Sequence, residues 1–371
     1  MSVESRLSSI RQLRNIAAAD LARRVGVSRQ TIYAIESGSY VPNTAVALRL
    51  ARELETPVEE LFTLAESSGS AAETVTATVL SAAPAASGRP VRLAKVRNQW
   101  ICAPADTLPC YLPEADGIVT QTRRGPLEAR VQVFGAAEAM NKRLVVAGCD
   151  PAIGLLIRMA ERLSGLEMVA VPASSRRAIQ WLKQGKVHIA GSHLEDPRSG
   201  EFNLPYLSKV MPNEDLAVVT FARWEEGFVV RHGNPLGIRG AGDLAQPKLR
   251  LVNRERGSGS RALLDLLLRQ AGVPPGRVRG YQNLAAGHLP AAYLVALGEA
   301  DCCVATPSAA RAFGLDFVPL RAERFDFAIR REFLDLPAVR SLLDILQRAA
   351  LRRKLQSLAG YDTSQTGRTV V

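Results

Sequence analysis

The stretch VNRERGSGSRALLDLLL, residues 252–268, joins an apolar segment to a helical pattern through a charged turn of glycine and serine. Leu249–Asn253 has the apolar character of a buried strand, and the residues after the turn have helical spacing. A helix N-terminus presents unpaired backbone N–H groups and a partial positive charge. Gly257 and Gly259 let the backbone approach a ligand closely, and the serines beside them add hydroxyl groups. The turn therefore predicts a cradle for an anion.

Strand and helix patterns alternate on both sides of this turn. The predicted strands cover 143–149, 168–174, 186–194, 249–255, 278–283 and 301–305, and the helices between them cover 150–165, 175–185, 257–272 and 288–300. This order predicts two α/β lobes with parallel strands, in which ligands bind at the carboxyl ends of the strands. Two longer segments, 215–235 and 315–332, read as crossings between the lobes. Two lobes linked in this way form a hinged clamp.

Polar residues begin several of the predicted helices in both lobes, which suggests a small oxyanion held between opposing donors. The predicted ligand-binding residues are Cys149, Asp150, Ser174, Ser175, Ser192, His193, Gly257, Ser258, Gly259, Ser260, Arg261 and His288. Plainer roles stay open for some of them. Both histidines could be capping or surface groups, Asp150 reads as a helix cap that would repel an anion, and Arg261 could pair with a nearby acid. The turn itself lacks the Gly-Lys-Ser/Thr ending of a phosphate-binding loop.

Composition indicates a soluble chain of two to three domains. The 371 residues are 47% hydrophobic and 22% charged, and the net charge of +11 suits an anionic partner such as nucleic acid. The five cysteines include no C-x-x-C pair, so neither a structural metal site nor a disulfide framework is expected. We find no signal peptide and no apolar run of the roughly 18 residues that a membrane span needs. These features predict a cytoplasmic protein.

Residues 1–65 have the pattern of an all-α DNA reader. The segment DLARRVGVSRQTIYAIESGSYVPNTAVALRLARELETPVEELF, residues 20–62, contains short amphipathic helices separated by glycine turns. Leu21, Val25, Ile32 and Ile35 would point inward, and Ser28 is a ready N-cap. Residues 5–64 resemble the phage-repressor (Cro-like) family of helix-turn-helix proteins. The resemblance implies binding to double-stranded DNA.

The recognition helix implied by this resemblance covers residues 28–37. Its DNA-binding residues would be Ser28, Arg29, Gln30, Thr31 and Tyr33. Arginine and glutamine can each read a base edge with two hydrogen bonds, and hydroxyl groups can contact phosphates. At the start of the preceding helix, Ala17 and Ala18 stand where the family has a hydroxyl cap and a phosphate-contacting glutamine. A single reader would therefore bind weakly, and we expect a homodimer or a higher homo-oligomer.

Two segments separate this DNA reader from the lobes. Residues 66–90 are rich in Ala, Ser, Thr and Gly and read as a flexible linker, although 74–80 could form a strand. Residues 91–139 alternate like strands and predict a small β-rich segment. The predicted domains are thus 1–65 for DNA binding, 66–90, 91–139, and 140–371 for ligand binding.

Six motifs in the lobes resemble the type 2 periplasmic-binding-protein fold over residues 143–362. They are VAGCDPAIGLL, IAGSHLED, VNRERGSGSRALLD, AAGHLPAAYLVALGEADC, LDFVPLRAERFDFAI and GYDTSQTG. The closest resemblance is to the subgroup fused to helix-turn-helix regulators or to molybdopterin-biosynthesis proteins. This subgroup implies molybdate or tungstate as the bound ligand. Ser260 replaces the threonine that is usual in its G-S-G-T-R motif, and the hydroxyl group is kept.

The sequence thus predicts a transcription regulator that binds operator DNA and senses a small oxyanion. An organic acid remains an alternative ligand, and a cytosolic protein that stores or delivers the oxyanion or serves molybdenum-cofactor assembly remains an alternative function. An enzyme is not expected, because no nucleophile–base pair, metal cluster or nucleotide loop stands out by its spacing. No cofactor is expected beyond the bound effector.

Overall fold

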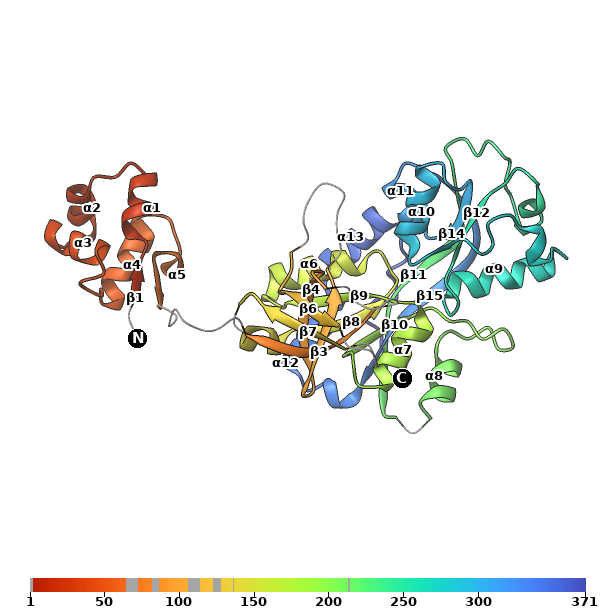
Figure 1. Cartoon of the computed structure of the whole chain (residues 1–371), viewed down its shortest axis with the longest axis horizontal. Coiled ribbons are helices and arrows are strands. Elements are labelled where there is room, and N and C mark those ends of the chain that lie inside the picture. The colour runs from red at the N-terminus through yellow and green to blue at the C-terminus, as the bar shows by residue number, and fades with distance from the viewer. Residues whose placement is uncertain are drawn as a thin grey trace. The chain divides into compact units, whose positions relative to one another are not determined.

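The computed structural model describes residues 3–64, 73–81, 87–105, 114–122, 128–135, 137–212 and 214–371. The chain divides into two compact units, Met1–Ala72 and Glu73–Val371 (Figure 1). Cys110 lies outside the described residues. Among the described residues, no helix combines the length and the apolar character that crossing a membrane would require.

The described part of the first unit, residues 3–64, is a bundle of five helices, as the apolar spacing predicts. They are α1 Leu7–Leu13, α2 Ala18–Val25, α3 Arg29–Glu36, α4 Thr44–Glu53 and α5 Val58–Leu61. The predicted inward residues Leu21, Val25, Ile32 and Ile35 lie in one buried core. A short antiparallel ribbon that the sequence did not reveal, β1 Val3–Ser5 with β2 Phe62–Leu64, joins the two ends of the bundle.

The β-rich segment is a closed barrel. Its strands are β3 Thr74–Val79, β4 Pro90–Val96, β5 Gln99–Pro104, β6 Gly117–Thr122 and β7 Glu128–Val133, paired in the order β3-β5-β4-β6-β7. The structure differs here from the predicted linker at 66–90, because β3 pairs with β7 over five positions and buries every other residue. Its threonines and alanines have the low charge of a linker, but they alternate as a strand requires.

The barrel is built onto the first lobe. Leu80, Val96 and Ile101 of the barrel share one apolar core with strands of that lobe. Arg143, at the junction, forms an ion pair with Asp116 of the barrel at 2.8 Å and donates to a backbone carbonyl of β4. The barrel therefore belongs to the same compact unit as the lobes.

The two predicted lobes are connected through one eight-stranded sheet. The strands are β8 Leu144–Gly148, β9 Met168–Pro172 and β10 Ile189–Ser192 in the first lobe, β12 Leu251–Arg254, β13 Leu284–Ala285 and β14 Cys302–Ala305 in the second, and the crossings β11 Leu216–Val230 and β15 Asp316–Arg330. The crossings pair antiparallel along their whole length, with irregularities at Thr220/Ala222 and Glu226/Gly227. Both crossings follow the sequence prediction closely.

Helices cover the sheet, and the alternating pattern predicts those within 150–165, 175–185, 257–272 and 288–300 but not the others. They are α6 Ile153–Ser164, α7 Ser175–Lys183 and α8 Leu204–Val210 beside the first lobe's strands, α9 Gly259–Gln270, α10 His288–Ala296 and α11 Pro307–Ala312 in the second lobe, and α12 Pro337–Gln347 and α13 Ala349–Lys354, which return to the first lobe (Figure 1). The prediction of a strand over 278–283 is wrong, because Gly280 turns the chain with φ of +85° and pairing starts only at β13.

The two lobes touch where α7 and α9 begin. The backbone N–H of Arg176 donates to the carbonyl of Gly257 at 3.2 Å. Gly259, the first residue of α9, lies against His193, which follows β10 of the other lobe. A Cβ at position 259 would lie 2.5 Å from the His193 ring and 2.8 Å from its carbonyl oxygen. Only glycine permits this approach.

We predict that Gly259→Ala destabilises the second unit by about 1–3 kcal/mol, because the methyl group must push the lobes apart or displace His193. Chemical denaturation of the full chain measures the change. Gly154→Ala is the matched control, since Gly154 lies in α6 with no atom within 4 Å of an added Cβ. That control should gain up to about 1 kcal/mol of helix stability. Equal effects of the two changes would contradict the described lobe contact.

Candidate functional site

The predicted recognition helix is α3, and its start is fixed by a cap. The Ser28 hydroxyl oxygen accepts a hydrogen bond from the backbone N–H of Thr31 at 3.0 Å, and the two hydroxyl groups lie 2.9 Å apart. Ser28 is therefore the N-cap that the sequence predicts. At the other end of α3, Glu36 forms a largely buried ion pair with Arg11 of α1 at 2.6 Å. The cap fixes where α3 begins, and the ion pair holds α3 against α1.

The outer face of α3 carries the polar residues that the sequence predicts as base readers. Arg29, Gln30 and Tyr33 are exposed, and Thr31 is half-buried. The Arg29 guanidinium group donates to the Tyr33 hydroxyl at 2.8 Å and lies over its ring. The helix before it, α2, has Ala17 as its N-cap. Alanine has no side-chain oxygen, so no side chain caps this helix. This face thus offers an arginine, a glutamine and hydroxyl groups together.

In the second unit, the predicted ligand residues of the first lobe gather at the carboxyl ends of its strands. Cys149 and Asp150 follow β8, Ser174 and Ser175 begin α7 after β9, and Ser192 and His193 end β10. The second lobe brings two segments toward them, the turn 257–261 at the start of α9 and His288 at the start of α10. The meeting of strand ends and helix starts is therefore as predicted.

Most of the predicted hydroxyl donors already have partners inside the protein. Ser175 accepts a hydrogen bond from the backbone N–H of His193 at 3.2 Å, and Ser192 donates to the Asn203 side chain at 2.8 Å. Ser258 caps α9 by accepting from the Arg261 N–H, and it donates to a carbonyl of the same turn. Ser192 and Ser258 therefore use their hydroxyl hydrogens inside the protein, whereas the Ser175 hydroxyl only accepts in this bond and keeps its hydrogen for donation.

The mouth of the cleft contains a basic pocket of about 310 Å³ lined from both lobes. Its lining residues are Arg176, Arg256, Gly257, Ser258, Arg261, Ala262, Asp265 and Tyr281. Arg261 is engaged there, because it pairs with Asp265 at 3.0 Å and lies 4.0 Å from the centre of the Tyr281 ring. Within the described residues, Arg176 and Arg256 form no ion pair. Their positive charges remain available to an anion.

His193 occupies the floor of the cleft and joins three chain segments. Its Nε2 lies 3.3 Å from the Cys149 sulfur, and its Nδ1 lies 2.5 Å from a carboxylate oxygen of Glu323 on β15. Burial lowers the pKa of His193, but the charges of Cys149 and Glu323 raise that pKa well above its usual value. The His193 ring is thus held between the Cys149 sulfur and the Glu323 carboxyl group.

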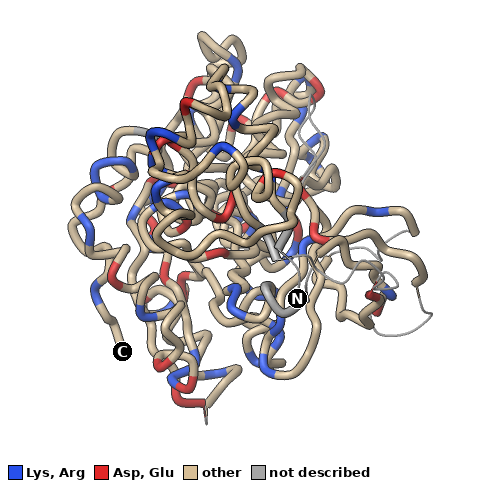
Figure 2. Tube along the Cα trace, turned by 90° about the vertical axis from the view of Figure 1, so that its left-hand side faces the viewer, with Lys and Arg blue, Asp and Glu red and all other residues tan. Residues whose placement is uncertain are grey.

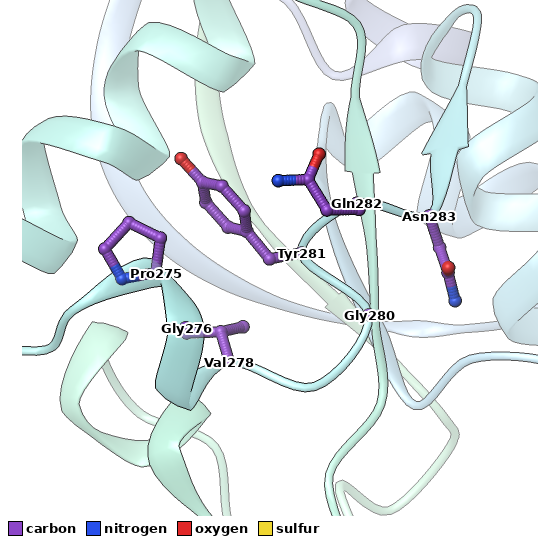
Figure 3. Close-up of a pocket in the computed structure, with 7 residues that line it drawn as sticks. All are labelled: Pro275, Gly276, Val278, Gly280, Tyr281, Gln282 and Asn283. Carbon is purple, nitrogen blue, oxygen red and sulfur yellow. The ribbon is translucent and has the colours of Figure 1, made fainter.

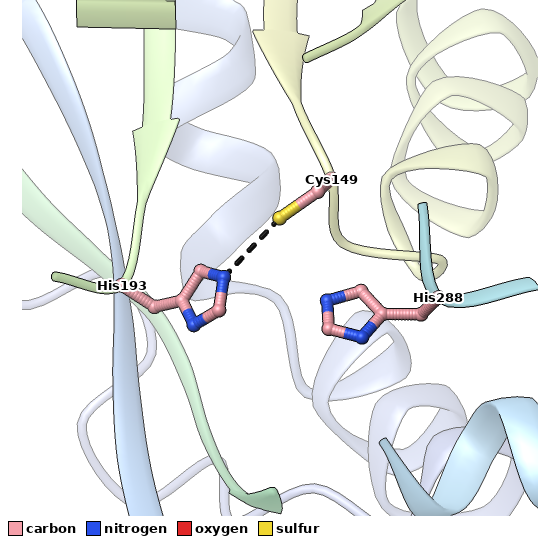
Figure 4. Close-up of side chains that lie close together, drawn as sticks. All are labelled: Cys149, His193 and His288. Atoms are coloured by element: carbon pink, nitrogen blue, oxygen red, sulfur yellow. Dashed lines mark hydrogen bonds between the residues drawn. The ribbon is translucent and has the colours of Figure 1, made fainter. Parts of the chain in front are cut away.

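His288 reaches the same place from the second lobe. Figure 4 shows its ring with one nitrogen turned toward the Cys149–His193 pair. The side chain is fully buried, and among the described residues neither ring nitrogen has a hydrogen-bond partner. Burial, with the positive charges of Arg254 and His193, lowers the pKa of His288 well below its usual value. His288 is therefore a neutral imidazole without a partner.

Carboxylates surround this floor. Glu226 of β11 is fully buried, and one of its oxygens lacks a hydrogen-bond partner within the described chain. Burial and the charge of Glu323 raise the pKa of Glu226. Asp150 accepts hydrogen bonds from the Ala152 N–H at 2.6 Å and from the Tyr361 hydroxyl at 3.0 Å, and burial raises its pKa to about 7. Asp150 thus stabilises the turn before α6. It is not the N-cap of that helix, because α6 begins at Ile153 and its N-cap is Ala152.

Sequence reasoning did not identify Glu226 and Glu323, because both lie in segments interpreted only as crossings. A signal was present, since acids interrupt otherwise apolar strands in RWEEGF (223–228) and RAERF (321–325). The sequence also shows no nucleophile–base pair and no metal cluster, because residues 149, 193, 288 and 323 are far apart in the chain. The fold brings all four together. Chemically, such a group can activate a thiol or ligate a metal.

A second hollow, of about 290 Å³, lies in the second lobe beside β12 and β13. Figure 3 shows its lining, which is formed by Pro275, Gly276, Val278, Gly280, Tyr281, Gln282 and Asn283. Tyr281 is the one titratable group among these lining residues, so this hollow offers little chemistry beside the cleft.

Comparison with known proteins agrees with this division of the chain. The sequence profile of the PBP superfamily domain matches residues 157–347, about half of the chain, and the helix-turn-helix profile matches residues 7–61. The protein YvgK of Bacillus subtilis is 30% identical over 244 residues, which are 66% of this chain and 79% of YvgK. The HTH-type transcriptional regulator MJ0272 of Methanocaldococcus jannaschii is 40% identical over 60 residues, 16% of this chain and 91% of that protein.

Among solved structures, a putative phosphate transporter substrate-binding protein with bound phosphate from Clostridium perfringens aligns with a TM-score of 0.44 at 13% identity, over 58% of this chain and 98% of that one. The family assignment depends on the matched profile and on YvgK. Together with the two-lobed fold, these matches show that the chain belongs to the family with the PBP superfamily domain, here preceded by a helix-turn-helix domain.

Proposed function

We propose that this protein is a transcription regulator whose binding to operator DNA depends on a small anion held between the two lobes. One combination of features carries the proposal. The first unit exposes the polar face of α3, and the second unit contains a basic pocket lined from both lobes. Regulation of DNA binding would place the protein in the cytoplasm.

The DNA-binding part of the proposal is supported by the exposed side chains of α3. Gln30 and Arg29 are the residue types that read adenine and guanine in the major groove, and Thr31 and Tyr33 can contact phosphates. Figure 2 shows Lys and Arg interspersed with Asp and Glu along the chain, so the net charge of +11 is not confined to one segment. Because the start of α2 has no side-chain cap, a single helix-turn-helix domain would bind DNA weakly. A homodimer that binds two half-sites would restore the affinity.

The ligand part is supported by the charges at the cleft mouth. Arg176 comes from the first lobe and Arg256 from the second, so an anion between them contacts both lobes at once. The turn at Gly257 adds the N-terminus of α9, which favours negative charge. Molybdate or tungstate is the specific ligand we propose, on the sequence resemblance. An organic acid would meet the same basic groups and is the alternative.

Coupling between the ligand and DNA requires that the ligand binds one arrangement of the lobes more tightly than the other. An anion that bridges Arg176 and Arg256 meets this condition, because only closed lobes bring both groups to it. The alternative of a storage or delivery protein lacks this requirement. It predicts ligand binding without any effect on DNA.

Replacement of Gln30 by Ala should weaken binding to the operator by about 1–3 kcal/mol, because a bidentate base contact is lost. Fluorescence anisotropy with a selected operator duplex measures the change. Gln12→Ala is the matched control, since Gln12 is an exposed glutamine of α1, and it should bind like the wild type. Equal affinity of wild type and Gln30→Ala for operator and for random DNA would reject the proposed reading face.

Molybdate should shift operator affinity in the wild type, and Arg256→Ala should require a higher molybdate concentration for the same shift. Loss of one charge-assisted contact costs about 1.5–3 kcal/mol. Calorimetry with molybdate, tungstate, sulfate and phosphate, followed by the anisotropy assay, measures both effects. Arg277→Ala, an exposed arginine of the same lobe outside the pocket, is the control. Binding of molybdate without any change in DNA affinity would favour the delivery protein.

A further inference from the structure

The floor of the cleft, beneath the basic pocket, contains a thiol and two imidazoles directed at one point. One donor atom each from Cys149, His193 and His288 lies within 4.8 Å of the other two. The three residues come from separate parts of the fold, after β8, after β10 and at the start of α10 (Figure 4). Both histidines are about 1% exposed, and Cys149 is half-buried, so a small ion can reach the sulfur.

The hydrogen bonds of these side chains leave the ring nitrogens of His288 without a partner in the described chain. His193 is held by Glu323 at Nδ1, which leaves its Nε2 facing the Cys149 sulfur at 3.3 Å. His288 is buried with no hydrogen bond at either nitrogen within the described residues, and its Nδ1 lies 3.6 Å from Glu226. Buried polar groups without partners cost stability. A ligand that accepts electron pairs from both imidazoles would remove this cost.

The surrounding charges favour a cation at this point. Glu226, Glu323 and Asp150 line the floor, and the buried Arg254 donates toward Glu255 and Ser260 and also acts on Cys149 and Glu226 through its charge. One oxygen of Glu226 and one of Asp150 have no hydrogen-bond partner in the described chain. These free carboxyl oxygens are electron-pair donors, which suit a dication and not an oxyanion.

We propose that Cys149, His193 and His288 bind a transition-metal dication of the zinc type at the floor of the cleft. Sulfur and imidazole donors select such ions over calcium and magnesium, which prefer oxygen. In a tetrahedral zinc site, a sulfur and a nitrogen ligand lie roughly 3.5 Å apart, close to the 3.3 Å between Cys149 and His193. Glu323 orients His193 through its second nitrogen, as carboxylates commonly do for metal-binding histidines.

The metal site would join the two lobes, because Cys149 and His193 belong to one lobe and His288 to the other. This inference goes beyond the proposed anion sensor and does not rest on it, since the basic pocket has a different lining. A cysteine nucleophile with a His193–Glu323 pair is the competing interpretation. It leaves His288, whose ring nitrogens have no hydrogen-bond partner in the described chain, without a role, whereas the metal site uses His288 as a ligand.

Titration of the metal-free, reduced full chain with Co²⁺ tests the proposal. We expect one equivalent of Co²⁺ to bind with a thiolate-to-cobalt charge-transfer band in the near ultraviolet, and Zn²⁺ to displace it. Cys149→Ser should remove the band. Glu323→Gln removes a hydrogen-bonding partner of a ligand and should weaken Co²⁺ binding by about 10- to 100-fold. His288→Gln removes a ligand itself and should weaken Co²⁺ binding at least as much.

Three matched variants control for other thiols, imidazoles and the anion pocket. Cys102→Ala removes a buried cysteine of the barrel, His232→Gln removes an exposed histidine, and Arg256→Ala alters only the basic pocket. All three should keep the wild-type band and affinity. Absence of the band in the folded wild type, or a band that survives Cys149→Ser, overturns the proposal. If Co²⁺ binds as expected while molybdate leaves operator binding unchanged, the metal site stands and the result counts against the proposed regulator instead.

Discussion

The contact between His193 and Gly259 is the constraint on which the second unit depends. His193 follows the first lobe's strand β10 and is anchored to the crossing strand β15 through Glu323. On its other side lies the first residue of α9, with no room for a side chain. The hydrogen bond to Glu323 and the contact with Gly259 both involve the His193 ring. This ring therefore sets the positions of both lobes and of the crossings together.

This arrangement separates charges along the depth of the cleft. Arginines from both lobes line the mouth, whereas carboxylates of the crossings and of the turn before α6 line the floor. The proposed anion and the proposed metal ion would therefore have different places in the same cleft. Each place contains groups from both lobes, so a ligand at either one favours the lobes in contact.

The sequence predicts the parts of the fold that depend on local patterns. Ser28 caps α3 and Gly26 ends α2, and both could be recognised because caps and turns need particular residues at particular positions. The alternation of strands and helices predicts the lobes for the same reason. The strand that the sequence allows over 74–80 is β3, but its place in a barrel could not be predicted, because barrel closure depends on pairing with a strand more than 40 residues away.

The site was predictable only in part. The sequence places the turn at Gly257 and the strand ends correctly at the cleft, since topology alone brings them there. It cannot show that Ser192 donates to Asn203, that Arg261 is held by Asp265, or that Glu226 faces His288. Each of these facts depends on side chains that meet only after the chain has folded.

Amide hydrogen exchange in the full chain, with and without saturating molybdate, tests the shared site most directly. The two segments to follow are 174–176 at the start of α7 and 257–261 at the start of α9, which line the cleft from opposite lobes. Our account predicts that molybdate slows exchange in both segments together. Slower exchange in one segment alone, or in neither, would contradict it.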